Sequence, residues 1–185
     1  MTRVSAEVLE GAGLRLRRAR FADAAFLAAL ATDPAVEPFI SAMAPREPSE
    51  LRRAIERSLD EPAEQGRFLI EVGGNRPAGA LAFELVHRRS RSAHLFGVAV
   101  TPELQGRGLG AAASRLMAEH LIRDLGYHRV QLECYGFNQR AVHMFERAGF
   151  VREGVKRKAY WRHGGWADGV LLALIEDDLG APPGP

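Results

Sequence analysis

Hydrophobic residues recur along the chain with two different periods, and these periods predict its elements. Leu14 and Leu16 alternate with polar residues and indicate a strand, whereas Phe26, Leu27 and Leu30 recur with helical spacing. Four prolines between residues 32 and 48 exclude a single regular element there. A second helix is expected to follow, from Ser49 as its N-cap through Leu59.

The remainder of the chain is predicted to form six strands and two helices. Strands are expected at 67–72, 78–86, 92–100, 128–135, 150–161 and 166–176, and helices at 109–125 and 139–148. Asn138 is expected to cap the last helix, and Gly126 and Gly149 to end the two helices. Three meandering strands followed by strand–helix–strand units indicate a mixed sheet with helices packed on it, in the α/β or α+β class.

Length and composition are typical of one globular domain. With 185 residues, we expect an N-terminal extension at 1–11, a single domain at 12–179 and a disordered tail at 180–185. No apolar run is long enough for a membrane span, and no N-terminal export signal is seen. Cys134 is the only cysteine, which excludes an internal disulfide and makes the reducing cytoplasm the expected location.

The charged residues point to neither a nucleic-acid partner nor a metal. Net charge is +2, and the arginines are scattered among acids instead of forming a basic stripe. The densest basic stretch, residues 152–165, is interpreted as a solvated hairpin face. The six histidines show no metal-ligand spacing, so no metal site is predicted.

The most informative stretch is Gln105-Gly106-Arg107-Gly108-Leu109-Gly110, which runs from a strand into a helix. Unpaired amides and the dipole at a helix N-terminus favour a phosphate, and glycines let the backbone approach it closely. The spacing G-x-G-x-G fits neither the dinucleotide-binding pattern G-x-G-x-x-G nor the P-loop, which needs a Lys and a hydroxyl residue.

These residues resemble the Q/R-x-x-G-x-G/A signature of the GCN5-related N-acetyltransferases (GNAT superfamily). A second stretch, 132–150, is similar to another motif of this family through Glu133, Asn138, Ala141, Gly149 and Phe150. The segment 153–179 resembles the C-terminus of the RimJ/RimL-like branch. The resemblance implies a mixed, mostly antiparallel sheet of about seven strands flanked by about four helices.

The resemblance also implies acetyl-CoA as co-substrate and no metal. Backbone amides of the loop would bind its pyrophosphate, and the strand before the loop would pair with its pantetheine arm, with an amide near Val100 polarising the thioester carbonyl. Asn138 and Phe145 would lie along the pantetheine and thiol. The implied cofactor-binding residues are Val98, Ala99, Val100, Gln105, Gly106, Arg107, Gly108, Leu109, Gly110, Ala111, Asn138, Ala141 and Phe145.

A proton must leave the acceptor amine, and a positioned base adds about 10²–10⁴ in rate. Glu133 is the first candidate, because some N-terminal acetyltransferases of the superfamily use the glutamate at this motif position. Glu84 is the second candidate, while Glu37 and a water relay stay open. Many family members carry a tyrosine at the position of Phe145, and that tyrosine protonates the leaving thiolate. Because phenylalanine has no proton to give, another donor is needed in this chain. Tyr135, or a water on Asn138, could take that role.

Other residues have simpler interpretations. Cys134 is expected to be a buried apolar side chain and not a nucleophile. Trp161 and Trp166 are expected to pack across the final hairpin. We expect the acceptor site between the proline-rich loop (32–48) and the hairpin (156–168).

The leading hypothesis is an N-acetyltransferase acting directly on a primary amine, whether a protein N-terminus, a polyamine, an amino acid or an antibiotic amine. A catalytically silent acyl-CoA-binding domain is the alternative, supported only by Phe145. A nucleic-acid-binding module is the weakest reading, and a homodimer is an implication of the family alone.

Overall fold

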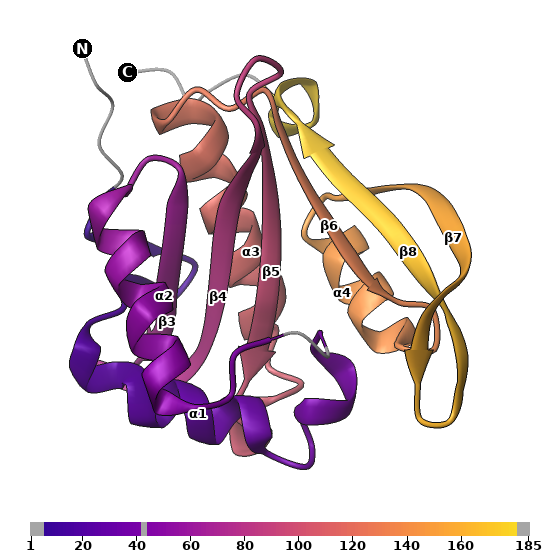
Figure 1. The fold of residues 1–185 in the computed structure, drawn as a ribbon. Helices are drawn as coiled ribbons and strands as arrows, with labels where there is room; N and C mark the ends of the chain where they lie inside the picture. The colour runs from indigo at the N-terminus through magenta and orange to yellow at the C-terminus, as the bar shows by residue number, and fades with distance from the viewer. Residues whose placement is uncertain (1–5, 42–43, 181–185) are drawn as a thin grey trace.

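One mixed sheet forms the centre of the molecule, in a computed structural model that describes residues 6–41 and 44–180. Its eight strands lie in the order β1-β2-β3-β4-β5-β6-β8-β7, and only the β5–β6 pair is parallel (Figure 1). The strands are β1 (Val8–Gly11), β2 (Leu14–Arg18), β3 (Gln65–Val72), β4 (Arg76–His87), β5 (Ser92–Val100), β6 (Arg129–Tyr135), β7 (Val151–Arg162) and β8 (Gly165–Ile175). The mixed, mostly antiparallel class predicted from the sequence is confirmed.

The sheet has one strand more than the seven predicted. β1 pairs with β2 in the register Val8↔Arg17 to Gly11↔Leu14. It lies inside the segment 1–11, which the sequence analysis placed in an extension before the domain. Four residues are too few to show an alternating pattern, and this strand exists because β2 offers a free edge. Of the predicted tail, residues 181–185 lie outside the described part of the chain.

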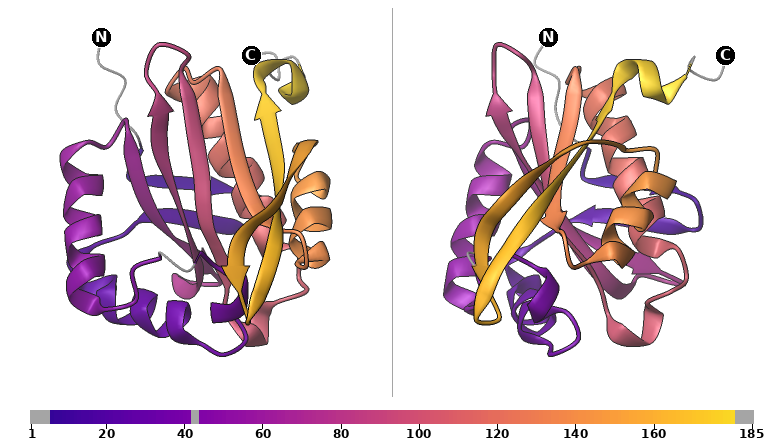
Figure 2. Two further views of the ribbon diagram at one scale, coloured as in Figure 1. Left: turned by 45° about the vertical axis from the view of Figure 1, so that its right-hand side comes forward. Right: turned by 90° about the vertical axis from the view of Figure 1, so that its right-hand side faces the viewer.

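Helices cover both faces of the sheet (Figure 2). On one face, α1 (Ala24–Thr32) and α2 (Pro48–Asp60) pack with Leu69 of β3 and Ala80 of β4. On the other, α3 (Leu109–Glu119) and α4 (Gln139–Arg147) cover the larger core. Short 3-10 turns occur at Phe21–Asp23, Glu37–Phe39 (η2), Pro102–Leu104 and Glu176–Leu179.

Two helix boundaries differ from the sequence prediction. α2 begins at Pro48 and is capped by Glu47 in a reciprocal capping box with Glu50, so the prediction of Ser49 as N-cap was wrong. Proline suits the first helical position because its missing N–H has no intrahelical partner there. The helix expected at 109–125 is α-helical only to Glu119 and continues as a π-helical turn, His120–Asp124.

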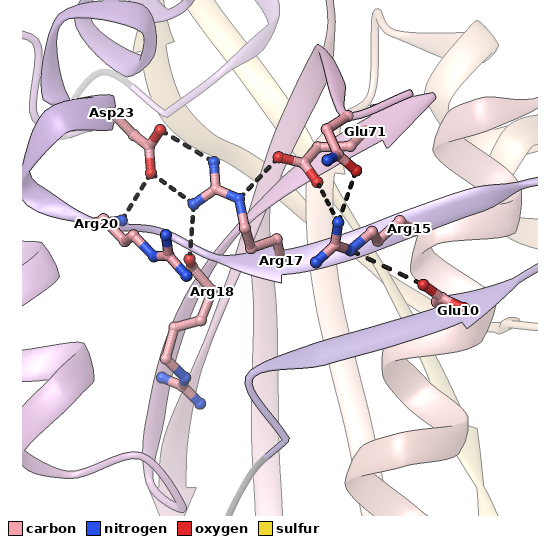
Figure 3. A network of polar contacts seen from close by, with 8 residues as sticks. Glu10, Arg15, Arg17, Arg18, Arg20, Asp23 and Glu71 are labelled. Atoms are coloured by element: carbon pink, nitrogen blue, oxygen red, sulfur yellow. Dashed lines mark hydrogen bonds and ion pairs between the residues drawn. The ribbon is translucent and has the colours of Figure 1, made fainter. Parts of the chain in front are cut away.

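A network of charged residues joins the first strands to the start of α1 (Figure 3). Arg17 donates from Nε to Glu71 Oε1 at 2.7 Å and from Nη1 to Asp23 Oδ2 at 2.9 Å. The Glu71 side chain is only 3% exposed, and Arg15 lies 3.8 Å from its second oxygen. Burial raises the pKa of Asp23, but the hydrogen bonds from Arg17 and from the Arg20 amide, together with the charges of both arginines, lower it overall. The network therefore ties β2 and β3 to the loop that leads into α1.

Arg18 is buried, and its guanidinium is held by backbone carbonyl groups. Its guanidinium donates to Ser58 O at 2.6 Å, Pro62 O at 3.0 Å and Gln65 O at 3.1 Å, and it lies over the ring of Phe68. Burial lowers its pKa to about 10. These bonds satisfy carbonyl groups at the C-terminal end of α2 and in the segment that follows it.

Replacing Arg18 with methionine is expected to lower the free energy of unfolding by about 3 kcal/mol or more, because several buried carbonyls lose their donors together. Urea denaturation measures this loss. Arg20→Met, two residues along at an exposed position, is the control and should change stability by less than about 0.5 kcal/mol. Equal stability of the two variants would show that the buried guanidinium does not hold α2.

Candidate active site

A cleft opens where β5 and β6 part from each other. The two strands pair only from Ser92↔Arg129 to His94↔Gln131, and the described pairing stops there. Beyond this point β5 continues to Val100 along β4 alone, with a bulge marked by the left-handed φ of +63° at Gly97. The cleft has a volume of about 770 Å³ and is lined from both strands, from α3, α4 and from the loop before α2.

The glycine loop forms one end of this cleft. Gly106 and Gly108 both have φ of +79°, a conformation that side chains rarely adopt. Gly108 is the N-cap of α3, and a Cβ at either glycine would meet no protein atom within 4 Å. The loop is therefore a bare helix N-terminus that faces open space, which suits an anion such as a phosphate.

Gln105 fixes the start of this loop. Its Nε2 donates to the carbonyl of Val100 at 3.0 Å, and its Oε1 accepts from Arg140 on α4 at 3.2 Å. Gln105 thus links the end of β5 to α4 across the cleft. This explains in physical terms why a glutamine stands before the glycines.

Most of the cofactor-binding residues predicted from the sequence line the cleft: Val98, Ala99, Val100, Gln105, Gly106, Gly108, Leu109, Gly110, Asn138, Ala141 and Phe145. Arg107 and Ala111 lie outside its described lining. Asn138 caps α4 as predicted, with its side chain accepting from the Ala141 amide at 3.1 Å. Met144 of α4 packs directly against Gly110 of α3: a Cβ atom added at Gly110 would lie 2.5 Å from the Met144 Sδ atom. α3 and α4 therefore pack closely beside the glycine loop.

Glu133 of β6 faces the other end of the cleft. Its Oε2 accepts from Lys156 Nζ on β7 at 2.7 Å, and its side chain is 14% exposed. Its Oε1 lies against Gly169 of β8, where an added Cβ would overlap it. β7 and β8 thus hold the carboxylate from two sides, and the glycine provides its space.

Glu84, the second predicted base, is exposed and lies outside the described lining of the cleft. It stands opposite His94 in the β4–β5 register, and His94 does line the cleft. Burial lowers the pKa of His94, although the charges of Glu84 and Glu133 oppose the shift. This shift favours the neutral form of the His94 imidazole. No local sequence signal marks His94, because its place opposite Glu84 and in the cleft comes from the pairing of β4 with β5.

Tyr135 and Tyr160 stand on the same face of the sheet as Glu133. Their rings meet edge to face with centroids 5.5 Å apart, and both line the cleft. Burial, followed by the adjacent Glu133 carboxylate, raises the pKa of Tyr160 to about 12. Tyr160 therefore keeps its proton near neutral pH. Tyr160 was not predicted from the sequence, because only the pairing of β7 with β8 and of β8 with β6 brings it to Glu133.

Cys134 is half-buried and packs against the main core. Burial raises the pKa of its thiol to about 11. It stays a protonated thiol near neutral pH, which agrees with the expectation that it is no nucleophile.

The proline-rich loop and the final hairpin meet beside the cleft. Arg162 of β7 donates to the carbonyls of Glu37 and Pro38 at 3.1 and 3.2 Å. Its guanidinium also lies over the ring of Tyr135. Trp161 and Trp166 pair directly across the hairpin with centroids 5.3 Å apart, as predicted. Both tryptophans lie outside the described lining of the cleft.

Among the described residues, no group of three or more potential ligands could hold a metal ion. None of the helices in the described part of the chain is long and apolar enough to cross a membrane.

Residues 13–151 match the family model of the acetyltransferase (GNAT) domain. The chain belongs to the GNAT family. It is an acetyl-CoA-dependent N-acetyltransferase, and the fold expected from the GNAT motifs is confirmed.

Two curated relatives act on different amines. The spermidine N(1)-acetyltransferase of Escherichia coli K12 is 24% identical over 129 residues, which cover 69% of this chain and 67% of that protein. The ribosomal protein bS18-alanine N-acetyltransferase of Salmonella typhimurium is 34% identical over 96 residues, or 50% of this chain and 62% of that protein. Spermidine N-acetyltransferase from Vibrio cholerae, solved with CoA and spermine, has the same fold, with a TM-score of 0.79 and 21% identity, covering 91% of this chain and 98% of that one.

Proposed function

We propose that this GNAT enzyme transfers the acetyl group directly from acetyl-CoA to a primary amine that enters beside Glu133. One observation carries the proposal: a single cleft is lined by a glycine loop that leaves the N-terminus of α3 bare and by a carboxylate held by Lys156. The acceptor would reach the cleft between the proline-rich loop and the β7–β8 hairpin.

The residues of the glycine-loop end fit acetyl-CoA. Amides from Gly106 to Ala111 would hold the pyrophosphate, because Gly106 and Gly108 leave the helix N-terminus bare and facing open space. β5 pairs with β6 only from Ser92 to His94, so its edge is open further along. The pantetheine arm would pair with this open edge at Val98, Ala99 and Val100. Acetyl-CoA supplies the acetyl group as a reactive thioester.

Glu133 is proposed as the base. The amine nitrogen forms a bond to the acetyl carbon, the carbon–sulfur bond breaks, and the proton lost by nitrogen passes to Glu133. The thiolate then takes up a proton. Lys156 and Gly169 fix the direction in which the carboxylate points. Correct geometry is the first requirement of a general base, before its pKa. Glu84 stays the second candidate and would act through His94, since it stands opposite that residue outside the cleft.

Tyr135 is proposed as the proton donor to the thiolate, with Tyr160 next to it on the same face. Phe145 has no proton to give. A thiol pKa of about 8.5 makes coenzyme A a fair leaving group even without a strong acid, so this loss is tolerable.

The finer assignments rest on sequence. The RimJ/RimL-like branch is supported by residues 153–179, and a reducing cytoplasm by the single cysteine. We propose no nucleic-acid partner, and a homodimer remains a proposal from the family.

Release of free thiol from acetyl-CoA, followed over a panel of primary amines, tests the proposal. Amine-dependent release with equimolar N-acetyl product is expected. Tight binding of acetyl-CoA without release on any amine would overturn it and favour the silent acyl-CoA-binding domain.

A further inference from the structure

Aromatic rings line the end of the cleft beside Glu133, where the acceptor amine is proposed to enter and which is called the acceptor end below. Phe39 of η2 lies 6.3 Å from Phe137, which follows β6, and Tyr135 stacks on Phe137 at 5.2 Å between centroids. Tyr160 of β7 meets Tyr135 from the side. All four rings line the cleft, and they come from three separate segments of the chain.

Two of these rings are left open to solvent. Phe39 is 47% and Phe137 45% exposed, although both lie at a concave site. Exposed aromatic faces that meet in a cleft mark a site for an apolar group, because a ligand that covers them removes their surface from water.

The charges around these rings are already paired. Glu133, the only carboxylate among the described residues that line the cleft, binds Lys156. Glu37 in the adjacent loop binds Arg46 at 2.9 Å and Arg162 at 3.4 Å. Two carboxylates therefore stand beside three fixed cations.

This charge pattern is unfavourable for a polycation. One ammonium group can approach Glu133, but the further ammonium groups of a polyamine would meet arginine and lysine side chains. The positive charges of these side chains repel the additional ammonium groups, and this repulsion selects against polyamines as acceptors.

We infer that the acceptor is a primary monoamine whose neighbouring group is aromatic or otherwise apolar; this rests on the proposed function. The amine is directed to Glu133, and the apolar group covers Phe39 and Phe137. A small arylalkylamine and a peptide with an apolar N-terminal residue share this chemistry.

Steady-state acetylation of four probes tests the inference: 2-phenylethylamine, a short uncharged peptide beginning with phenylalanine, ethanolamine and spermidine. At least one of the two aromatic probes is expected to exceed both ethanolamine and spermidine in kcat/KM by about tenfold. Whichever aromatic probe is preferred identifies the source of the amine. A preference for spermidine or ethanolamine would overturn the inference while leaving the proposed function intact, whereas no turnover on any amine would overturn the proposed function itself.

A variant at the exposed ring gives a second, independent measurement. Phe137→Ala is expected to raise KM for the preferred aromatic probe by about two- to tenfold, with less change for ethanolamine. Trp161→Ala is the matched control. Trp161 is also a large exposed aromatic residue, 61% exposed on the β7–β8 hairpin, but it lies outside the described lining of the cleft. An equal KM for the aromatic probe in both variants would contradict the role of the aromatic wall. Thermal unfolding of the two variants checks that neither change acts through stability.

Discussion

Replacing Glu133 with glutamine lowers kcat by about 10²–10⁴ while acetyl-CoA still binds, if this carboxylate takes the proton from the amine. Glutamine fills the same space beside Gly169 and cannot accept that proton. Thiol release measures kcat, and calorimetric titration measures cofactor binding. Glu153→Gln is the matched control, because Glu153 is also a carboxylate in an ion pair, with Arg129, but lies outside the described lining of the cleft.

A second variant changes the position of the carboxylate and keeps its chemistry. The methyl group of Gly169→Ala would overlap Glu133 Oε1, so the carboxylate must turn away. A loss of kcat smaller than that of Glu133→Gln is expected, since the base is displaced and not removed. Activity of Glu133→Gln within about threefold of the parent would exclude this residue as the base. Glu84→Gln and His94→Asn would then be the next variants to test.

Replacing Gly108 with valine weakens acetyl-CoA binding by about 10²-fold or more. A β-branched residue at φ of +79° is strained, and its side chain would fill the space that the bare loop leaves for the pyrophosphate. Calorimetric titration with coenzyme A gives the dissociation constant of each variant.

Gly13 provides a closely matched control for this change. It has φ of +75°, and a Cβ there would also meet no protein atom within 4 Å, but it lies in the β1–β2 turn. Gly13→Val should therefore carry a similar backbone strain and leave cofactor binding unchanged. If both valine variants bound coenzyme A as the parent does, the glycine loop would not be the pyrophosphate site.

Much of the fold could be predicted from local patterns. The strands at 92–100 and 128–135 were placed within a residue, because alternation and flanking turn residues are local signals. Asn138 was predicted as a cap for the same reason, since a cap acts on the next three residues. β1 was missed because it depends on the edge of β2 and not on its own short sequence.

The acceptor end of the site could not be predicted in the same way. Lys156, Tyr160 and Gly169 reach Glu133 only through the β6–β8–β7 order and a bulge in β7. The local sequence does not determine which strands are neighbours, and it gives no sign that β7 carries two residues more than β8 between the Lys156↔Gly169 and Tyr160↔Ala167 pairs.

By itself, the sequence determined the glycine loop with Gln105 before it and the motifs of the GNAT family, because each is encoded within a few consecutive residues whose backbone preferences and spacing are local. The mixed class of the sheet followed from the order of strands and helices along the chain. Only the tertiary structure decided that Phe39, Phe137 and Tyr160 form one aromatic wall, and that the carboxylates beside it are already paired. The Phe39–Phe137 contact joins residues 98 positions apart in the sequence, and the Tyr135–Tyr160 contact joins residues 25 positions apart. They exist because the sheet brings distant strands together, and this order is set by the packing of the whole domain.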